Sequence, residues 1–332
     1  NDKNPASIET YIKHGGYSAW KDVVNSKASK SSIIEKIKNS GLRGKGGAGF
    51  LTGLKWSFIP LASGQKYLVC NSDESEPGTC KDRDILRYNP HAIIEGMLIA
   101  SYAIGANVAY NYLRGEFIDE QKRVFDEALK RAYKENLVGA NILSSSISID
   151  IFSLIGAGAY IVGEETAMLE SIEGKRGMPR IKPPFPAIKG LFGKPTIINN
   201  TETLASVPKI MRSESDWYKD IGIEKSEGIK MFCMSGHINK PGNFEIPLGT
   251  PFRDLLNMSG GVLNDNKLKA VIPGGSSVPV VKGEDMLEIN MDYEAIKNVG
   301  SMLGSGAVVV MDENTCMVQA LARISEFYHE ES

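Results

Sequence analysis

The chain has 332 residues, and its 38 lysines and arginines nearly balance its 40 aspartates and glutamates, which gives a formal net charge of −2. This length allows roughly two or three domains, each large enough to bury an apolar core. The near-neutral charge argues against a general nucleic-acid binder or a binder of anionic membranes. With four cysteines, four histidines and no C-x-x-C pair, we expect no metal site built from this chain alone.

The most apolar stretch, residues 93–110, is interrupted by Glu95 and Asn107 and falls short of the roughly 18–20 apolar residues of a membrane span. Asn1 is not followed by a basic and then an apolar segment, so no secretory signal is expected. We therefore expect a soluble intracellular protein whose cysteines are reduced core residues.

Short polar helices are predicted at 8–14, 17–24 and 32–39, and Ser32 with Glu35 fits a capping box at the start of the third. Residues 41–53 then contain six glycines among thirteen residues. A regular helix or strand would be costly with this composition, so a shaped loop is predicted.

An α/β pattern follows this loop. A second glycine-rich turn is predicted at 156–163, before a helix that begins at Glu164. Residues 174–194 hold six basic residues, no acidic residue and four prolines, and are predicted to be extended or irregular. The predicted strands are 66–70, 108–113 and 146–152, and the predicted helices are 54–59, 82–87, 91–104 and 117–133.

A smaller module of strands and one helix is predicted for residues 230–282. Its strands are 230–235, 242–246 and 270–273, its helix is 251–258, and a strand at 307–311 and a helix at 314–330 come after it. The expected division of the chain is an N-terminal helical segment (1–40), an α/β domain (41–228), a small β domain (229–284) and a linker with the start of a helical domain (285–332).

The first glycine-rich loop fits the pattern G-x-G-x-x-G from Gly44 to Gly49, which lets backbone amides approach a phosphate or a flat ring. A helix rather than a strand is predicted before it, so an ordinary Rossmann site is not expected, and a purely structural turn remains the alternative. Nearby cations, Arg43, Lys45 and Lys55, favour a nucleotide phosphate. Phe50 and Phe58 are either core residues or a stacking platform for a ring.

Carboxylates and amides gather at three later points of the chain. Asn71, Asp73, Glu74 and Glu76 follow a predicted strand, where open α/β sheets bind ligands; the alternative is a solvated acidic loop. Asn71 can pair with the edge of a heterocycle, and the carboxylates would favour a cationic ring such as oxidised nicotinamide.

Glu164 and Glu165 open a predicted helix, so capping is their alternative role. Asn199, Asn200 and Thr201 form a helix-start signature that would offer amides to a phosphate. Neither a Ser-His-Asp nor a Cys-His arrangement is visible, which argues against hydrolysis. The residues by themselves indicate an α/β protein that binds a nucleotide or a flavin.

Four segments carry a family resemblance. The chain resembles the NADH- and FMN-binding flavoprotein subunit of respiratory complex I, which is the F subunit of bacterial NADH:quinone oxidoreductase and has a mitochondrial counterpart. The resemblance implies a Rossmann-like α/β domain for FMN and NADH, then a β-grasp domain of the soluble-ligand-binding type at 229–284, then the start of a helical iron–sulfur domain. The four segments are GLRGKGGAGFLTGLKW (41–56), CNSDESEPGTCKDR (70–83), GAGAYIVGEETAMLESIEGKRG (156–177) and KPPFPAIKGLFGKPTIINNTET (182–203).

The resemblance implies hydride transfer from NADH to FMN and single-electron delivery to iron–sulfur clusters on the way to quinone. By motif position, the implied FMN contacts are Gly44, Lys45, Gly46, Gly47, Lys55, Asn71, Asp73, Glu74, Gly163, Glu164, Ile198, Asn199, Asn200 and Thr201. The implied NADH contacts are Phe50, Phe58, Glu76, Tyr160, Glu165, Lys182 and Phe185. Glu76 and Glu165 are the candidate catalytic carboxylates, and they would act by their charge, because direct hydride transfer needs no general acid or base.

The implied partners are two other proteins of complex I: the small E-type protein with a two-iron cluster and the large G-type iron–sulfur protein. The implied location is peripheral, on the cytoplasmic side of the bacterial inner membrane or on the matrix side in mitochondria. In the family, a cysteine-rich segment that ligates a four-iron (4Fe–4S) cluster follows the stretch resembling residues 326–332. This sequence stops before that segment, so we expect the cluster ligands to be absent from it.

Two other functions remain open. The same module serves as the diaphorase subunit of NAD-linked formate dehydrogenases or hydrogenases, and a non-catalytic scaffold would retain the fold. The intact glycine loop and carboxylates argue against the scaffold. The strings GKGGAG and SEPGTCKDR argue against the related ion-pumping ferredoxin:NAD oxidoreductase.

Overall fold

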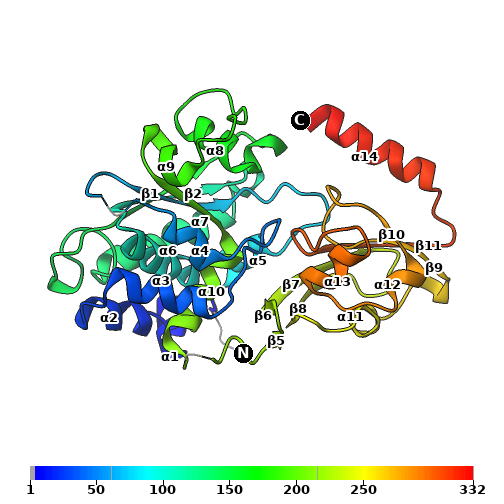
Figure 1. Cartoon of the computed structure of the whole chain (residues 1–332), viewed down its shortest axis with the longest axis horizontal. Coiled ribbons are helices and arrows are strands. Elements are labelled where there is room, and N and C mark those ends of the chain that lie inside the picture. Colours follow the sequence, from blue (N-terminus) through cyan, green and yellow to red (C-terminus); the bar gives the residue numbers. More distant parts are fainter. Residues whose placement is uncertain (1–3, 61, 215, 332) are drawn as a thin grey trace. The chain divides into compact units, whose positions relative to one another are not determined.

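The computed structural model describes residues 4–60, 62–214 and 216–331, and these form two compact units (Figure 1). Unit 1 comprises 4–42, 51–74 and 82–214, and unit 2 comprises 43–50, 75–81 and 216–331. Two short segments early in the chain therefore belong to the same unit as its C-terminal third. These two segments are the first glycine-rich loop and part of the acidic loop.

Unit 1 is built on a parallel sheet of four strands in the order β3-β2-β1-β4. β1 (Tyr67–Ser72) lies between β2 (Val108–Leu113) and β4 (Thr196–Asn200), and β3 (Asp150–Ile155) lies at the edge beside β2. The parallel sheet confirms the α/β fold. The strand predicted at 146–152 begins later, because Ile149 forms an isolated antiparallel bridge with Gly139.

Helix α6 (Pro90–Ile104) is buried along almost its whole length and packs closely against α10 (Thr201–Arg212). A Cβ at Gly96 would lie 2.0 Å from the carbonyl oxygen of Leu204, so glycine permits this approach. The other helices of unit 1 are α1 (Ile8–Lys13), α2 (Ser18–Asn25), α3 (Lys30–Asn39), α4 (Thr52–Ser57), α5 (Asp82–Tyr88), α7 (Gln121–Lys134), α8 (Glu165–Ile172) and α9 (Pro186–Lys189).

The capping box predicted at Ser32 is wrong. The residue that caps α3 is Ser29, whose Oγ accepts a hydrogen bond of 3.1 Å from the Ser32 amide. Lys30 and Ser31 are polar, so the apolar pattern of the helix does not include them. They still form its first turn, because the Ser29 side chain accepts a hydrogen bond from a backbone amide of that turn.

Unit 2 contains a mixed sheet of five strands in the order β10-β9-β11-β7-β8. β11 runs parallel to β7 and antiparallel to β9, so the strand at 307–312, placed by the sequence in the segment 285–332, lies in the middle of this sheet. Apolar side chains including Phe232, Phe252 and Val310 form its core. The strands are β7 (Ile229–Gly236), β8 (Gly242–Pro247), β9 (Leu268–Ile272), β10 (Val281–Lys282) and β11 (Ala307–Asp312), with a separate pair, β5 (Gly222–Ile223) and β6 (Ser226–Glu227).

The helices of unit 2 are α11 (Phe252–Met258), α12 (Gly283–Met286), α13 (Tyr293–Asn298) and α14 (Met317–Glu331). In α14, Met317, Ala320 and Ile324 pack on a small apolar cluster, while Val318 and Leu321 are exposed. Across the described parts of the chain, every helix is too short or too polar to cross a lipid bilayer.

Candidate functional site

The parallel sheet of unit 1 reverses its strand order between β1 and β4. From β1 the chain adds β2 and β3 on one side, whereas β4 returns to the other side of β1. In open parallel sheets, ligands bind beyond the carboxyl ends of the strands at such a switch point. Asn71 and Asp73 lie at the end of β1, and Asn199, Asn200 and Thr201 lie at the end of β4. The tertiary structure therefore brings these five predicted site residues together.

Hydrogen bonds fix the polar groups at the end of β1. Asn71 Nδ2 donates to the carbonyl oxygen of Gly163 at 2.9 Å, and Thr201 Oγ1 donates to the carbonyl oxygen of Asn71 at 3.1 Å. The hydroxyls of Ser72 and Thr201 are 2.6 Å apart. The end of β1 is thus joined both to the second glycine-rich turn and to the start of α10.

The end of β4 confirms the predicted helix start. Asn200 Oδ1 accepts from the Glu202 amide at 3.0 Å and caps α10, while Asn200 Nδ2 donates to Asp82 Oδ2 at 2.6 Å. Trp56 Nε1 donates to Asn199 Oδ1 at 2.8 Å. The Ile198 side chain is 3% exposed and belongs to the apolar core of unit 1, so this side chain is not available to a ligand.

Glu74 has a structural function in unit 1. Its two carboxylate oxygens accept from the amides of Asp82 at 2.7 Å and Arg83 at 3.0 Å, and so bind the first turn of α5. Arg114 Nη1 donates to the Glu74 carbonyl oxygen at 2.7 Å. The loop after β1 is therefore ordered by its own contacts and is not the loosely solvated acidic loop that the sequence left as an alternative.

Two glutamates and two lysines form a charged cluster beside the start of α8. Glu164 caps the helix and accepts hydrogen bonds from the amides of Thr166 at 2.8 Å and Ala167 at 2.9 Å. This confirms the capping role that the sequence offered as an alternative. Glu165 does not cap the helix. Instead it pairs with Lys55 Nζ at 3.0 Å and Lys182 Nζ at 3.6 Å, and Lys182 also pairs with Glu164 at 3.0 Å.

The protonation of this cluster follows from its contacts. Burial is the largest influence on the pKa of Glu164 and raises it, but hydrogen bonds from Thr166, Ala167 and Lys182 outweigh burial and leave the pKa below its ordinary value. Burial likewise lowers the pKa of Lys182, and its pairs with Glu164 and Glu165 outweigh this and raise the pKa. Both shifts favour the ionised forms of Glu164 and Lys182 at neutral pH.

Aromatic side chains expected to meet a ring are accessible. Phe58 is 50% exposed and Phe185 is 58% exposed, so the interpretation of Phe58 as a core residue is wrong. Tyr160 is half-buried in the turn that precedes Glu164. In unit 2, Phe50 is 51% exposed, and the core interpretation is wrong for it too.

Residues 43–50 of the first glycine-rich loop are held by other side chains of unit 2. Lys230 Nζ donates to the carbonyl oxygen of Lys45 at 2.7 Å, and Tyr293 Oη donates to that of Gly44 at 3.2 Å. Gly49 has φ +68°, and a Cβ there would lie 2.3 Å from the Tyr293 ring. The loop also closes on itself, since Gly44 N donates to Phe50 O at 2.8 Å. The shape of the loop is therefore set both by its glycines and by Lys230 and Tyr293 of the same unit.

Lys45 and Glu76 both contact other residues of unit 2. The Lys45 side chain is 3% exposed, and its Nζ lies 6.0 Å from the centre of the Tyr218 ring. Glu76 Oε1 accepts from Ser276 Oγ at 3.1 Å and from the Ser277 amide at 2.7 Å.

The predicted site residues thus fall into two sets. Unit 1 holds Lys55, Phe58, Asn71, Asp73, Glu74, Tyr160, Gly163, Glu164, Glu165, Lys182, Phe185, Ile198, Asn199, Asn200 and Thr201, and unit 2 holds Gly44, Lys45, Gly46, Gly47, Phe50 and Glu76. The sequence did not single out Asp82, Lys230 or Tyr293. A lysine inside the apolar strand 229–236 was the one available signal for Lys230.

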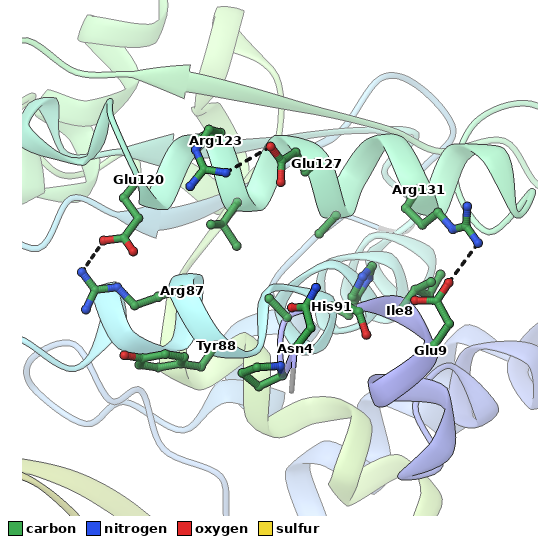
Figure 2. A pocket seen from close by; sticks show the side chains of 15 residues that line it. Asn4, Ile8, Glu9, Arg87, Tyr88, His91, Glu120, Arg123, Glu127 and Arg131 are labelled. Carbon is green, nitrogen blue, oxygen red and sulfur yellow. Dashed lines mark hydrogen bonds and ion pairs between the residues drawn. The ribbon is translucent and has the colours of Figure 1, made fainter. Parts of the chain in front are cut away.

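A groove of about 750 Å³ lies elsewhere on unit 1, between α1, α5, α6 and α7 (Figure 2). Three ion pairs line it, and none of its residues was predicted to bind a ligand. They are Arg87 with Glu120, Arg123 with Glu127 at 3.2 Å, and Arg131 with Glu9 at 3.0 Å. Since each cation has a carboxylate partner, the groove offers little net field to a charged ligand.

The described residues contain no group of three or more His, Cys, Asp or Glu side chains placed to hold a metal ion. Cys70 and Cys233 are buried, as expected of core residues, but Cys316 is exposed, so the expectation that the cysteines are core residues is wrong for it.

Two protein-family models match the chain. The one described as the Nuo51 FMN-binding domain matches residues 37–209, and the one described as the SLBB domain matches residues 230–310. The chain is 53% identical over 328 residues to the F subunit of NADH-quinone oxidoreductase from Rickettsia bellii (strain OSU 85-389), a match that covers 98% of this chain and 78% of that protein. It is 50% identical to the F 2 subunit of NADH-quinone oxidoreductase from Rhizobium meliloti (strain 1021), over 98% of this chain and 77% of that protein.

Among solved structures, the chain is similar to an NAD+-reducing NiFe-hydrogenase in the H2-reduced state, with a TM-score of 0.85 and 32% sequence identity. The match covers 98% of this chain and 54% of the hydrogenase chain, so the chain spans about half of that protein's length.

Proposed function

The chain belongs to the family of FMN-binding flavoprotein subunits of NADH-quinone oxidoreductase, and we propose that it binds NADH and FMN and transfers a hydride from one to the other. Bound FMN would supply the ability to accept two electrons as a hydride and to release them singly. The observation that carries the proposal is the gathering of Asn71, Asn199 and Asn200 at the switch point between β1 and β4.

The donor chemistry of the residues fits FMN. A flavin mononucleotide presents a phosphate and a ring edge that both donates and accepts hydrogen bonds. Lys55 is a cation held in an ion pair with a carboxylate, and the Asn71 amide suits the ring edge. We propose that Lys55 and Asn71 contact FMN, as do Asp73, Glu74, Gly163, Glu164, Ile198, Asn199, Asn200 and Thr201 of the same unit. In unit 2, the residues proposed to contact FMN are Gly44, Lys45, Gly46 and Gly47.

For NADH, we propose that the exposed rings of Phe58 and Phe185 in unit 1 bind its flat rings, with Tyr160 and Lys182 as further contacts. In unit 2, the residues proposed to contact NADH are Phe50, whose ring is exposed, and Glu76. The protein's contribution to the hydride step is orientation, because a direct transfer between stacked rings passes no proton through a side chain. Glu165 contributes a negative charge that disfavours the reduced flavin and favours departure of the nicotinamide product.

The four-iron cluster implied by the family resemblance does not fit the described residues, which hold no cysteine group of the required kind.

The proposed partners are other proteins of a complex I assembly, specifically its E-type and G-type iron–sulfur proteins. The proposed location is the cytoplasmic side of a bacterial inner membrane, bound through these partners.

The visible spectrum of the purified chain tests the proposal. Flavin absorbance that bleaches when NADH is added without oxygen is expected, as is NADH:ferricyanide activity without quinone reductase activity. Asn71→Ala should lower FMN retention, while Asn257→Ala, on the exposed side of α11, should not. A colourless protein that cannot take up FMN would contradict the proposal.

The hydrogenase similarity favours a second candidate, the diaphorase subunit of an NAD-linked hydrogenase or formate dehydrogenase. Identity of 53% to a protein of NADH-quinone oxidoreductase against 32% to the hydrogenase supports the first assignment. The proteins that co-purify with the chain from the source cells decide between the two.

A further inference from the structure

A fully buried lysine lies against the glycine loop of unit 2. Lys230 is on β7, its side chain is 0% exposed, and it shares one face of the strand with the core residues Phe232 and Met234. Burial of an ammonium group among apolar residues is costly unless polar atoms bind it. The Lys45 carbonyl oxygen accepts its hydrogen bond at 2.7 Å.

Gly306 leaves room for the Lys230 side chain. This glycine has φ +87°, and a Cβ at its position would lie 2.7 Å from Lys230 Cε. β11 begins at the next residue, Ala307, and is paired with β7. A glycine in the neighbouring segment therefore opens the path by which the lysine reaches the loop.

The direction of one carbonyl determines the direction of the following amide. The peptide between Lys45 and Gly46 is trans and planar, so its N–H points opposite to its C=O. With the Lys45 carbonyl directed at Lys230, the Gly46 N–H points to the other face of the loop. Tyr293 Oη binds the Gly44 carbonyl at 3.2 Å and orients the preceding peptide in the same way. Consecutive amides that point to one face of a loop can together bind an anion.

We propose that Lys230, a residue of the SLBB-type sheet, is a positioning residue for FMN. It holds the Lys45 carbonyl toward β7, so the Gly46 amide points to the opposite face of the loop, where it would meet the cofactor. Tyr293 does the same for the Lys45 amide. This inference rests on the proposed function, since Lys230 can position the glycine loop for FMN only if the chain binds FMN.

The test compares Lys230→Met with a matched surface control, Lys240→Met, in the full chain. Lys240 is exposed on the same module, and its side chain is not part of the proposed site. Methionine keeps the length and volume of Lys230 but donates no hydrogen bond. FMN affinity is measured by flavin fluorescence titration of the apoprotein, and amide hydrogen exchange is measured for residues 44–49 and for β7 and β11.

The expected result for Lys230→Met is an FMN dissociation constant at least about tenfold higher, with faster exchange confined to 44–49. At saturating FMN, kcat and the KM for NADH should return to within about twofold of the wild type. Lys240→Met should match the wild type. Tyr293→Phe, which removes one hydroxyl and keeps the ring, should give a smaller loss in the same direction.

Equal FMN affinity in Lys230→Met and wild type would overturn the inference while leaving the proposed function intact. Faster exchange throughout β7 and β11, together with a loss that added FMN does not restore, would show a purely structural lysine and would also overturn it. A wild-type protein that does not bind FMN at all would instead refute the proposed function.

Discussion

The two units hold their candidate ligand-binding residues by different means. In unit 1 these residues lie at the ends of regular elements, such as Asn71 at the end of β1 and Glu164 at the start of α8. In unit 2 the glycine loop has no regular structure, and its carbonyls are bound by Lys230 and Tyr293, which are 185 and 249 positions away in the chain. The comparison teaches that a strand end or helix cap positions a side chain locally, whereas a loop needs distant partners.

The largest effect is expected where the loop of unit 2 meets Tyr293. Gly49→Ala would place a Cβ 2.3 Å from that ring at a φ of +68°, and should lower the free energy of unfolding by about 3–4 kcal/mol. Gly47→Ala is the matched control, because a Cβ there meets nothing within 4 Å; its loss should stay within about 0.5 kcal/mol. Denaturant titration measures both, and equal losses would show that the loop is not held as described.

Acid should weaken unit 1 through His91. This residue is 1% exposed, and its Nδ1 lies 2.8 Å from the hydroxyl of Tyr17, in a cluster with Tyr11 and Glu95. Burial lowers the pKa of His91 to about 4 from its ordinary 6.5. The unfolded chain therefore binds a proton more readily, so stability is fully present above pH 6.5 and is lost as the pH falls toward 4.

The loss assigned to His91 amounts to up to about 3 kcal/mol over that pH window. His91→Asn, which does not titrate, should flatten the change in unfolding free energy between pH 6.5 and 4, whereas His329→Asn, on exposed α14, should leave it unchanged. An unaltered pH profile in His91→Asn would refute this origin of the acid sensitivity.

A smaller effect is expected from the charged cluster of unit 1. Lys55→Met removes the cation that pairs with Glu165 at 3.0 Å and should weaken FMN binding about tenfold, or roughly 1.4 kcal/mol. Lys38→Met is the control, since Lys38 forms only a surface pair with Glu35 at 3.8 Å. Fluorescence titration at two salt concentrations measures the change. If both variants bind FMN alike, Lys55 does not contribute to the site.

The smallest effect is expected for Glu165→Gln. Under the proposed function Glu165 lies beside bound FMN, where removal of its negative charge would stabilise the reduced form, so the midpoint potential should rise by about 20–30 mV, equivalent to roughly 1–1.4 kcal/mol. Glu170→Gln, on the same helix but paired with Arg180, is the matched control and should leave the potential unchanged. An anaerobic redox titration decides, and a shift of equal size in both variants would mean that Glu165 has no special role.

Much of the fold followed from local patterns. The structure confirms the strand at 108–113, the helix at 91–104 and the caps at Glu164 and Asn200. Each of these follows from the spacing of apolar residues or from a capping side chain within a few residues. The start of β3 was predicted too early, because Ile149 forms an isolated bridge with Gly139 instead. The cap of α3 was placed at Ser32 rather than Ser29, because the two serines are equally suited to cap a helix. The exposure of Phe50 and Phe58 could not be read from sequence, since an aromatic residue suits a core and a binding surface alike.

The sequence by itself determined the α/β class, the glycine loops and the acidic and basic segments, because composition and spacing act over short distances. The tertiary structure decided which of these segments meet. The return of β4 to the far side of β1 placed Asn199 and Asn200 beside Asn71, and the pairing of β7 with β11 set Lys230 beneath the glycine loop. Strand order and the partners of a buried lysine depend on contacts between segments that are far apart in the chain, which no local pattern records.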